Sequence, residues 1–161
     1  MSTTDGYARF TVLYAGATTL LLTSLVIVDT DHDGLPDWWE DRFGLNKNDR
    51  GDAALDSDGD GQSNLDEFRA GTQPNNSSSV FRIVSTQREA GNWRITWTVV
   101  GGKSYRVQTN ALSGTGSFAT NFADLSPLIV VPGSGESTMS YLHNGGVATI
   151  PARYYRVRLV P

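Results

Sequence analysis

Two stretches of this chain share one pattern, DTDHDGLPDWWE from Asp29 to Glu40 and DSDGDGQSNLDE from Asp56 to Glu67. Each has oxygen-bearing side chains at positions 1, 3, 5, 9 and 12 and a glycine at position 6. A loop that wraps a cation presents alternate side chains inward, and the glycine permits the sharp turn in its middle. Each stretch is therefore predicted to form a loop around a divalent metal ion.

The predicted ligands are hard oxygen atoms, including one backbone carbonyl at position 7 of each loop. Calcium is predicted over magnesium because so many carboxylates suit a large, flexible coordination shell. Zinc is disfavoured because the chain has no cysteine and only two histidines. We expect two calcium ions per chain, with the first held by Asp29, Asp31, Asp33, Leu35, Asp37 and Glu40, and the second by Asp56, Asp58, Asp60, Gln62, Asn64 and Glu67.

The charge distribution divides the chain into two different parts. Residues 1–77 hold 5 basic and 14 acidic side chains, whereas residues 78–161 hold 8 basic and 3 acidic ones. Two calcium ions would offset the formal net charge of −4. Without them, the crowded carboxylates of the first part repel one another and oppose its folding.

The two loops belong to an internal repeat with an offset of 27 residues. Each loop is predicted to lead into a short helix, about 36–43 and 63–70, that ends at a left-handed glycine, Gly44 or Gly71. No helix precedes either loop, so the pair differs from the helix-loop-helix of a calcium sensor and favours a structural role. The aromatic and aliphatic side chains of these helices are expected to form a small core, with a ligand platform as the alternative: Trp38, Trp39, Phe43, Leu65 and Phe68.

Residues 1–28 are predicted to contain a β-hairpin with strands at 8–14 and 18–28, joined by AGA. The uncharged run from Thr11 to Val28 also has about the minimum length of a membrane span or export signal. It fits neither well, because Asp5 replaces the expected positive start and several hydroxyl residues dilute it. The hairpin is expected to be either the end of a preceding sandwich or part of the C-terminal one.

Residues 77–161 are predicted to form a β-domain. Alternation is clear in WRITWTVV, where Trp93, Ile95, Trp97 and Val99 face one side of a sheet. Short strands of this kind, separated by glycine-rich turns, are typical of an antiparallel β-sandwich. The chain is thus expected to be mainly β, with a calcium-loop and short-helix module at 29–76 and strands at 80–85, 93–100, 104–109, 128–131, 137–142 and 154–160.

These features together resemble a known arrangement. The two acidic repeats, followed by a β-domain with GGKSYRVQTN and a terminal ARYYRVRLVP, are similar to the C-terminal region of large secreted bacterial proteins. In that region, thrombospondin type 3-like or dockerin-like calcium repeats join β-sandwich modules. The resemblance implies an immunoglobulin or fibronectin III-like sandwich, an extracellular or cell-surface location, and the ligand positions given above.

The function expected from these features is a calcium-rigidified module that anchors or displays other domains of a parent extracellular protein. A carbohydrate-binding module is the alternative, with cell-surface, plant or microbial glycans as ligands. Nucleic acid is not expected as a partner, since the basic half has no clustered lysine run. The candidate sugar contacts are aromatic and guanidinium groups on a sheet face: Arg94, Arg106, Tyr141, Tyr154, Arg156 and Arg158.

The third hypothesis is that the chain is an enzyme, and the sequence gives this hypothesis little support. Catalysis by a serine and histidine would depend on His32, inside a calcium loop, or His143, near a turn. Metal-assisted hydrolysis of a phosphoester or glycoside could use Glu89, Asp124 or Glu136 as a general base. Nothing in the spacing of these residues singles one out, so no catalytic residue is assigned.

Overall fold

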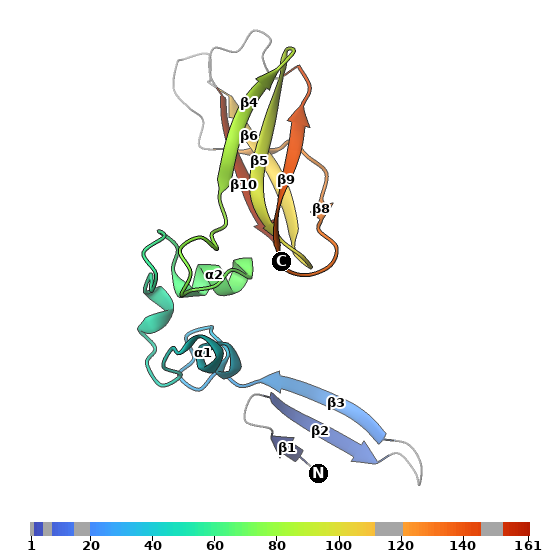
Figure 1. The fold of residues 1–161 in the computed structure, drawn as a ribbon. Helices are drawn as coiled ribbons and strands as arrows, with labels where there is room; N and C mark the ends of the chain where they lie inside the picture. Colours follow the sequence, from blue (N-terminus) through green and yellow to red (C-terminus); the bar gives the residue numbers. More distant parts are fainter. Residues whose placement is uncertain (1, 5–7, 15–19, 112–120, 146–152) are drawn as a thin grey trace. The chain divides into compact units, whose positions relative to one another are not determined.

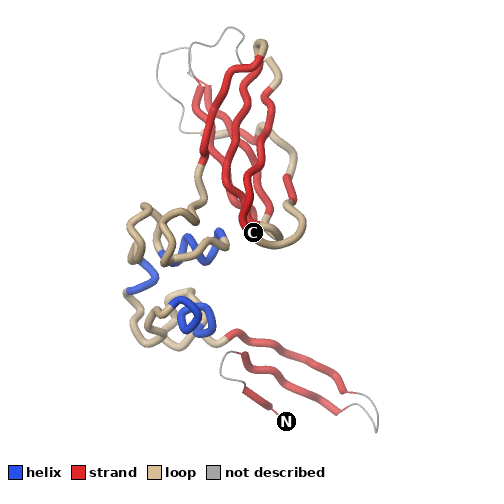
Figure 2. The backbone as a smooth tube through the Cα atoms, viewed as in Figure 1, coloured by secondary structure: helices blue, strands red, loops and turns tan. Residues whose placement is uncertain are grey.

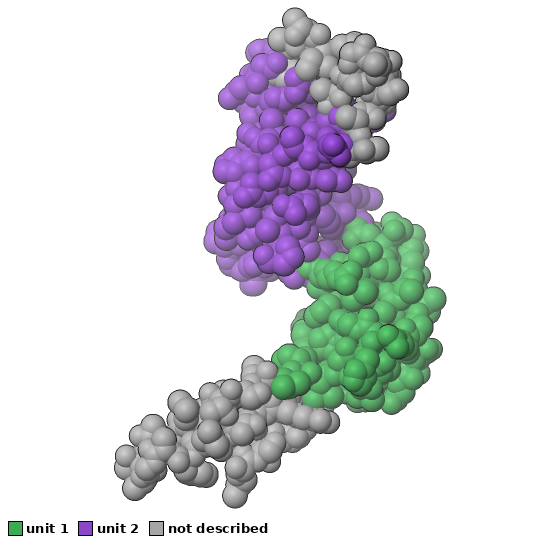
Figure 3. Space-filling view, turned by 180° about the vertical axis from the view of Figure 1, so that it is seen from behind, with its two compact units in different colours: residues 1–69, 73–78 green, residues 70–72, 79–161 purple. Residues whose placement is uncertain are grey.

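The computed structural model describes residues 2–4, 8–14, 20–111, 121–145 and 153–161 (Figure 1). The chain is mainly β, as predicted, with antiparallel sheets and two short α-helices. The helices lie in the middle of the sequence, and strands precede and follow them (Figure 2). Two compact units divide the chain, unit 1 with residues 1–69 and 73–78 and unit 2 with residues 70–72 and 79–161 (Figure 3).

Unit 1 begins with a three-stranded antiparallel sheet in the order β1-β2-β3. Strand β1 (Ser2–Thr4) pairs with β2 (Ala8–Tyr14), which pairs in turn with β3 (Leu20–Ile27). Strand β2 has the predicted extent and β3 lies within the predicted range 18–28, whereas β1 was not predicted. The predicted AGA connection lies outside the described residues. Among the described strands, those of this sheet pair only with one another.

Two seven-residue helices follow the acidic loops. Helix α1 is Asp37–Phe43 and helix α2 is Asn64–Ala70, each within one residue of its predicted extent. The glycine after each helix has a positive φ, 75° at Gly44 and 83° at Gly71, which confirms the predicted left-handed ends. None of the described helices is long and apolar enough to cross a membrane.

A small hydrophobic cluster holds the two loop-helix repeats of unit 1 together. Leu35, Trp39 and Ala53 are its buried members, and Leu65 of α2 packs against them. The other predicted core side chains mostly join this cluster, as Phe43 and Phe68 both pack against it. Trp38 differs, because it is 37% exposed. Its ring lies edge-on to that of Phe68, with 6.4 Å between the ring centroids.

Unit 2 contains two antiparallel sheets. One has the order β4-β5-β9, and the other has the order β10-β6-β7 with β8 also paired to β6. Their strands are β4 (Ile83–Glu89), β5 (Asn92–Val100), β6 (Ser104–Ala111), β7 (Ala123–Asp124), β8 (Ile129–Val130), β9 (Glu136–His143) and β10 (Arg153–Val160).

Side chains from both sheets form the core of unit 2. The predicted alternation on β5 is confirmed, since Ile95, Trp97 and Val99 are buried and the residues between them are not. Tyr105 and Val107 contribute from β6 in the other sheet. The Tyr105 hydroxyl, which would otherwise be an unpaired buried polar group, accepts a hydrogen bond from the Val100 N–H at 2.8 Å. The two sheets therefore share one hydrophobic cluster.

The predicted strands of unit 2 correspond to observed ones, with two differences. The first strand spans Ile83–Glu89 rather than 80–85, because residues 80–82 contact β5 through hydrogen bonds with Thr98 and not through a regular ladder. Strand β7 was not predicted, since two residues are too few to show alternation.

We predict that core burial, rather than strand position, determines the stability of unit 2. Val107 is completely buried and Val130 is 61% exposed, although both lie in strands of one sheet. Val107→Ala should lower the free energy of unfolding by about 2–3 kcal/mol, because it removes buried methyl groups and leaves a cavity. Val130→Ala should change it by less than about 0.5 kcal/mol. Urea unfolding measures both, and equal losses would contradict the assignment of this core.

Candidate metal centre

The first acidic loop is shaped by hydrogen bonds from its own backbone to its aspartates. The two carboxylate oxygens of Asp29 accept the N–H groups of His32 at 2.8 Å and Gly34 at 3.1 Å. Asp33 Oδ1 accepts the Leu35 N–H at 2.7 Å. Gly34 has a φ of 98°, which a side chain with a Cβ adopts only at a cost. The loop therefore turns at the glycine, as the sequence predicts.

The loop encloses carboxylate oxygens that have no hydrogen-bond donor. Glu40 is completely buried, and neither of its carboxylate oxygens accepts a hydrogen bond. Both oxygens of Asp31 and the Oδ2 of Asp33 are likewise buried without a donor. A buried carboxylate costs several kcal/mol unless it is paired or coordinates a metal. This arrangement fits a cation at the centre of the loop.

Burial, followed by mutual repulsion, raises the pKa values of Glu40 and Asp31. The pKa of Glu40 rises to about 8, chiefly through burial and then through the charges of Asp31, Asp33, Asp52 and Asp37. Burial followed by neighbouring carboxylates also raises the pKa of Asp31. Crowded carboxylates are stabilised either by protonation, which appears as a raised pKa, or by binding a divalent cation.

Asp52 joins this cluster although it lies outside both loops. Its carboxylate, that of Asp33 and that of Glu40 have ligand oxygens within 4.8 Å of one another. Asp52 opens the short 3-10 helix η1 (Asp52–Ala54), where its Oδ2 accepts the Asn46 N–H at 2.8 Å. Its Oδ1 is buried and accepts no hydrogen bond. The sequence pattern did not identify Asp52. The residue 27 positions later is Ser79, so the carboxylate is not repeated and no motif includes it.

Asp37, a predicted ligand, has a different role in the structure. Its two oxygens accept the Thr30 N–H and the Thr30 hydroxyl, each at 2.7 Å, and its side chain is not among the clustered metal-ligating groups. Both oxygens are thus engaged in closing the loop on itself. Thr30 supplies both donors at the point where the chain returns to begin α1, so Asp37 stays a predicted ligand that also braces the loop.

The second loop repeats the architecture of the first. Asp56 accepts the N–H groups of Gly59 at 2.8 Å and Gly61 at 2.9 Å, and Asp60 accepts that of Gln62 at 2.8 Å. Ligand oxygens of Asp56, Asp58 and Asp60 lie within 4.8 Å of one another. The Oδ2 atoms of Asp58 and Asp60 are buried and accept no hydrogen bond.

The remaining two predicted side-chain ligands of the second loop are buried at the start of α2. Asn64 and Glu67 are both completely inaccessible to solvent. Asn64 Nδ2 donates to the backbone carbonyl of Asp52 at 2.8 Å, while its Oδ1 accepts no hydrogen bond. Because the amide is fixed by its donor end, its oxygen is left for a cation.

The donor set of both loops consists of oxygen atoms. No histidine belongs to a metal-ligating cluster in the described part of the chain, and His32 is exposed with Nδ1 at 3.1 Å from the Thr30 carbonyl. Carboxylate and amide oxygens in this number suit calcium better than zinc or a largely hydrated magnesium ion. Leu35 and Gln62, the predicted carbonyl ligands, follow the glycine in the same turn of each loop.

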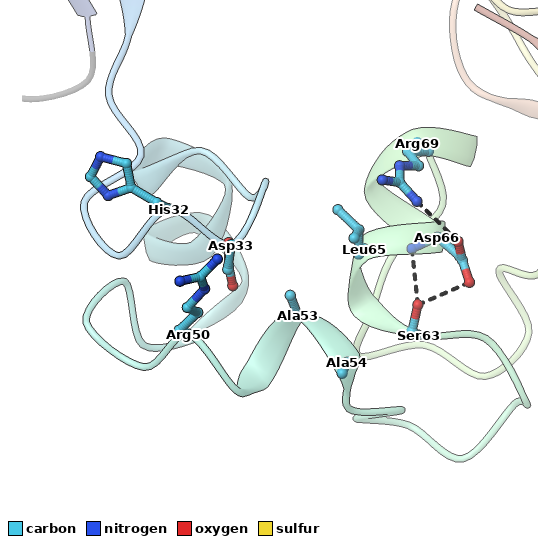
Figure 4. A pocket seen from close by; sticks show the side chains of 9 residues that line it. All are labelled: His32, Asp33, Arg50, Ala53, Ala54, Ser63, Leu65, Asp66 and Arg69. Atoms are coloured by element: carbon cyan, nitrogen blue, oxygen red, sulfur yellow. Dashed lines mark hydrogen bonds and ion pairs between the residues drawn. The ribbon is translucent and has the colours of Figure 1, made fainter.

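A shallow cavity of about 470 Å³ lies beside the first loop, η1 and α2 (Figure 4). Three of its polar lining residues, one just before α2 and two on it, contact one another. The Ser63 hydroxyl donates to Asp66 at 3.0 Å, and Arg69 lies 3.6 Å from the same carboxylate. These contacts brace the start of the helix, and the other polar residues that line the cavity are His32, Asp33 and Arg50.

The predicted sugar-contacting residues fall on different faces of unit 2. Arg94 donates two hydrogen bonds to Glu89, at 2.6 and 2.9 Å, from the β4-β5-β9 sheet. Tyr141 packs against the core, and its hydroxyl donates to the Leu125 carbonyl at 3.0 Å. The structure thus separates Tyr141 from the outer face on which Arg94 lies.

The other four lie on strands β6 and β10 of the second sheet. Arg106 donates to Asp124 at 2.8 Å, and Arg156 donates to Gln108 at 2.6 Å. Arg158 is the register partner of Arg106, and Tyr154 is 50% exposed. These side chains share one outer face, where Arg106 and Arg156 have hydrogen-bond partners and the charge of Arg158 helps to lower the pKa of Asp124.

The candidate general bases are engaged in structural contacts. The pKa of Glu89 is lowered chiefly by its hydrogen bonds from Arg94, and that of Asp124 chiefly by a hydrogen bond from Gln108. Glu136 accepts a hydrogen bond from the Ser79 hydroxyl. Burial lowers the pKa of His143, whose Nδ1 lies 2.9 Å from the Tyr155 hydroxyl. Each of these groups is therefore engaged in a contact within unit 2.

No family model, curated protein or solved structure matches the chain. The geometry of the two acidic loops is therefore the feature that points to a function.

We predict that backbone strain distinguishes the two loops. His32 has a φ of 64°, and the equivalent residue of the second loop is Gly59, with a φ of 80°. His32→Gly should raise the free energy of unfolding by about 1 kcal/mol, because a Cβ in the left-handed region costs roughly 1–2 kcal/mol and glycine's greater freedom in the unfolded chain offsets part of the gain. Gly59→His should lower it by a similar amount. Urea titration followed by NMR signals of residues 29–76 measures both, and a loss of stability in His32→Gly would contradict the prediction.

Proposed function

We propose that this chain is a calcium-binding structural module, in which two calcium ions hold residues 29–76 in shape. The observation that carries the proposal is Glu40, completely buried with two carboxylate oxygens that accept no hydrogen bond. Its neighbours Asp33 and Asp52 bring further carboxylates within 4.8 Å, so the local charge is strongly negative. A divalent cation is the group that stabilises such a site.

A structural role is favoured over a signalling role by what precedes each loop. Strand β3 ends at Ile27, just before the first loop, and an extended residue, Leu55, precedes the second. A calcium sensor changes the angle between an entering and an exiting helix, and here no entering helix occurs among the described residues. The ions would instead fix loops that have little hydrophobic core of their own.

The architecture of unit 2 supports the same proposal. We interpret its two antiparallel sheets, which share one hydrophobic cluster, as a β-sandwich of the immunoglobulin or fibronectin III-like type. Joined to calcium repeats, such a sandwich serves to space, anchor or display other domains. The partners proposed are therefore other domains of a larger secreted protein at the cell surface or outside the cell, where calcium is abundant.

Sugar binding is less well supported than the structural role. Arg94 and Arg106 form ion pairs with Glu89 and Asp124, and Tyr141 packs against the core. A sugar would have to compete for guanidinium groups that already have partners. These contacts favour a role in holding the sheets together.

We predict that the purified chain binds two calcium ions and that chelation destabilises the loop region selectively. Binding to the folded form alone stabilises it by about 4 kcal/mol at a thousandfold excess over the dissociation constant. Calorimetric titration of the chelator-treated chain should give a stoichiometry of two, and hydrogen exchange on chelator addition should accelerate in residues 29–76 more than in unit 2. A stoichiometry near zero, or selective uptake of zinc, would contradict the proposal.

We predict that Asp52, rather than Asp37, is a ligand of the first calcium ion. Asp52→Asn removes one of the clustered charges and should weaken the first site by about tenfold or more. Asp37→Asn is the matched control, because an amide can still accept the Thr30 N–H and can donate to the Thr30 hydroxyl. Its effect should be several-fold smaller. Calorimetric titration of both variants measures the difference, and a greater loss in Asp37→Asn would restore Asp37 as the ligand.

A further inference from the structure

We propose that Asp52 joins the two metal sites, so that calcium binds the first loop before the second and each ion raises the affinity of the chain for the other. This inference rests on the proposed calcium-binding function and adds an order and a coupling to it. Its basis is that one residue contacts both sites through different atoms.

The side chain of Asp52 belongs to the first site. It is 6% exposed, with Oδ1 free of hydrogen-bond donors and close to Asp33 and Glu40. The backbone carbonyl of Asp52 belongs to the second site, because it accepts the Nδ2 of Asn64 at 2.8 Å. That bond orients the completely buried Asn64 so that its Oδ1 remains available to a cation.

The segment that carries Asp52 is firmly attached to both loops. Ala53 is buried in one cluster with Leu35, which follows the turn of the first loop. The Asn64 N–H donates to the Leu55 carbonyl at 2.8 Å, at the other end of η1. A displacement of Asp52 from the first site would therefore also move the acceptors that hold Asn64.

The two sites differ in charge, which sets the order of binding. The first brings together carboxylates of five residues, whereas the second has four carboxylate residues and the neutral Asn64. Calcium affinity rises with the number of charged ligands. Ser79, the repeat equivalent of Asp52, cannot supply a fifth carboxylate to the second site.

The coupling follows from what happens without an ion. The carboxylates of Asp33, Glu40 and Asp52, with ligand oxygens within 4.8 Å of one another, then repel one another, which weakens the hold on Asp52 and on its carbonyl that accepts Asn64. The second ion must then supply the free energy of ordering Asn64 itself. Once the first ion holds Asp52 in place, Asn64 is already ordered, so the second ion binds without supplying this free energy. Coupling between sites is commonly 5- to 150-fold in affinity, and the same factor applies in both directions.

The test is a calcium titration of the full ¹⁵N-labelled chain by NMR. The amides of Gly34 and Gly61 report separately on the two loops, since each donates to the first aspartate of its own loop. Gly34 should respond at lower calcium concentration than Gly61. Glu40→Gln should weaken the response at Gly61 by at least about fivefold, and Glu67→Gln should weaken that at Gly34 by the same factor.

Asn64→Asp tests the route of the coupling. It keeps an oxygen ligand but removes the Nδ2 donor, so adding Glu40→Gln to it should change the Gly61 response by less than about twofold, well below the usual coupling range. Asp66→Asn is the control, because it removes an exposed charge on α2 that pairs with Arg69 and is not a clustered ligand. The coupling should persist in this variant.

The outcomes separate the two levels of the proposal. Absence of calcium binding in the wild-type chain would overturn the proposed function. Two ions bound with an unchanged Gly61 response in Glu40→Gln would overturn the coupling alone, and coupling that persists in Asn64→Asp would overturn its route through Asn64. The NMR signals of α1 show whether the first loop of the Glu40→Gln variant folds. If it does not, the coupling is tested by the Glu67→Gln variant and the order of binding by the wild-type chain. A Gly61 response at lower calcium concentration than the Gly34 response would overturn the proposal.

Discussion

The shape of unit 1 depends on the burial of carboxylates that no hydrogen-bond donor neutralises. Glu40 is the clearest case, because it is completely buried beside Asp33 and Asp52. The hydrophobic cluster around Leu35 and Trp39 is small, and a cluster of this size contributes little against the cost of placing several negative charges together. A cation reverses the sign of this electrostatic contribution, so the same residues that oppose folding without it favour folding with it.

Unit 2 is stabilised by different means. Its two sheets enclose Ile95, Trp97 and Val107, which are completely buried, and its surface charges are paired locally, as in Arg94 with Glu89. Such a core needs no ion. Under the proposed calcium binding, the uneven charge of the sequence corresponds to two ways of holding a chain together, one by metal coordination and one by apolar burial.

The sequence predicted what depends on local chemistry. The loop glycines, the two short helices and the inward face of β5 follow from backbone freedom and from alternation, and all three agree with the structure. Long-range partners could not be predicted in this way. Asp52 reaches the acidic cluster of the first loop from a linker, and Asp37 accepts two hydrogen bonds from Thr30. Position within a motif identifies an oxygen atom, whereas its neighbours in the folded chain depend on residues outside the motif.

The same reasoning explains why two repeats of one pattern are not equivalent. Position 9 is Asp37 in the first loop and Asn64 in the second. A carboxylate can only accept hydrogen bonds, so Asp37 turns to Thr30 within its own loop. An amide also donates, so Asn64 can bind the carbonyl of Asp52 and keep its oxygen for an ion. One change of side chain thus converts a contact within a loop into a contact between repeats. The proposed coupling of the two loops therefore depends on the amide at position 9 of the second loop.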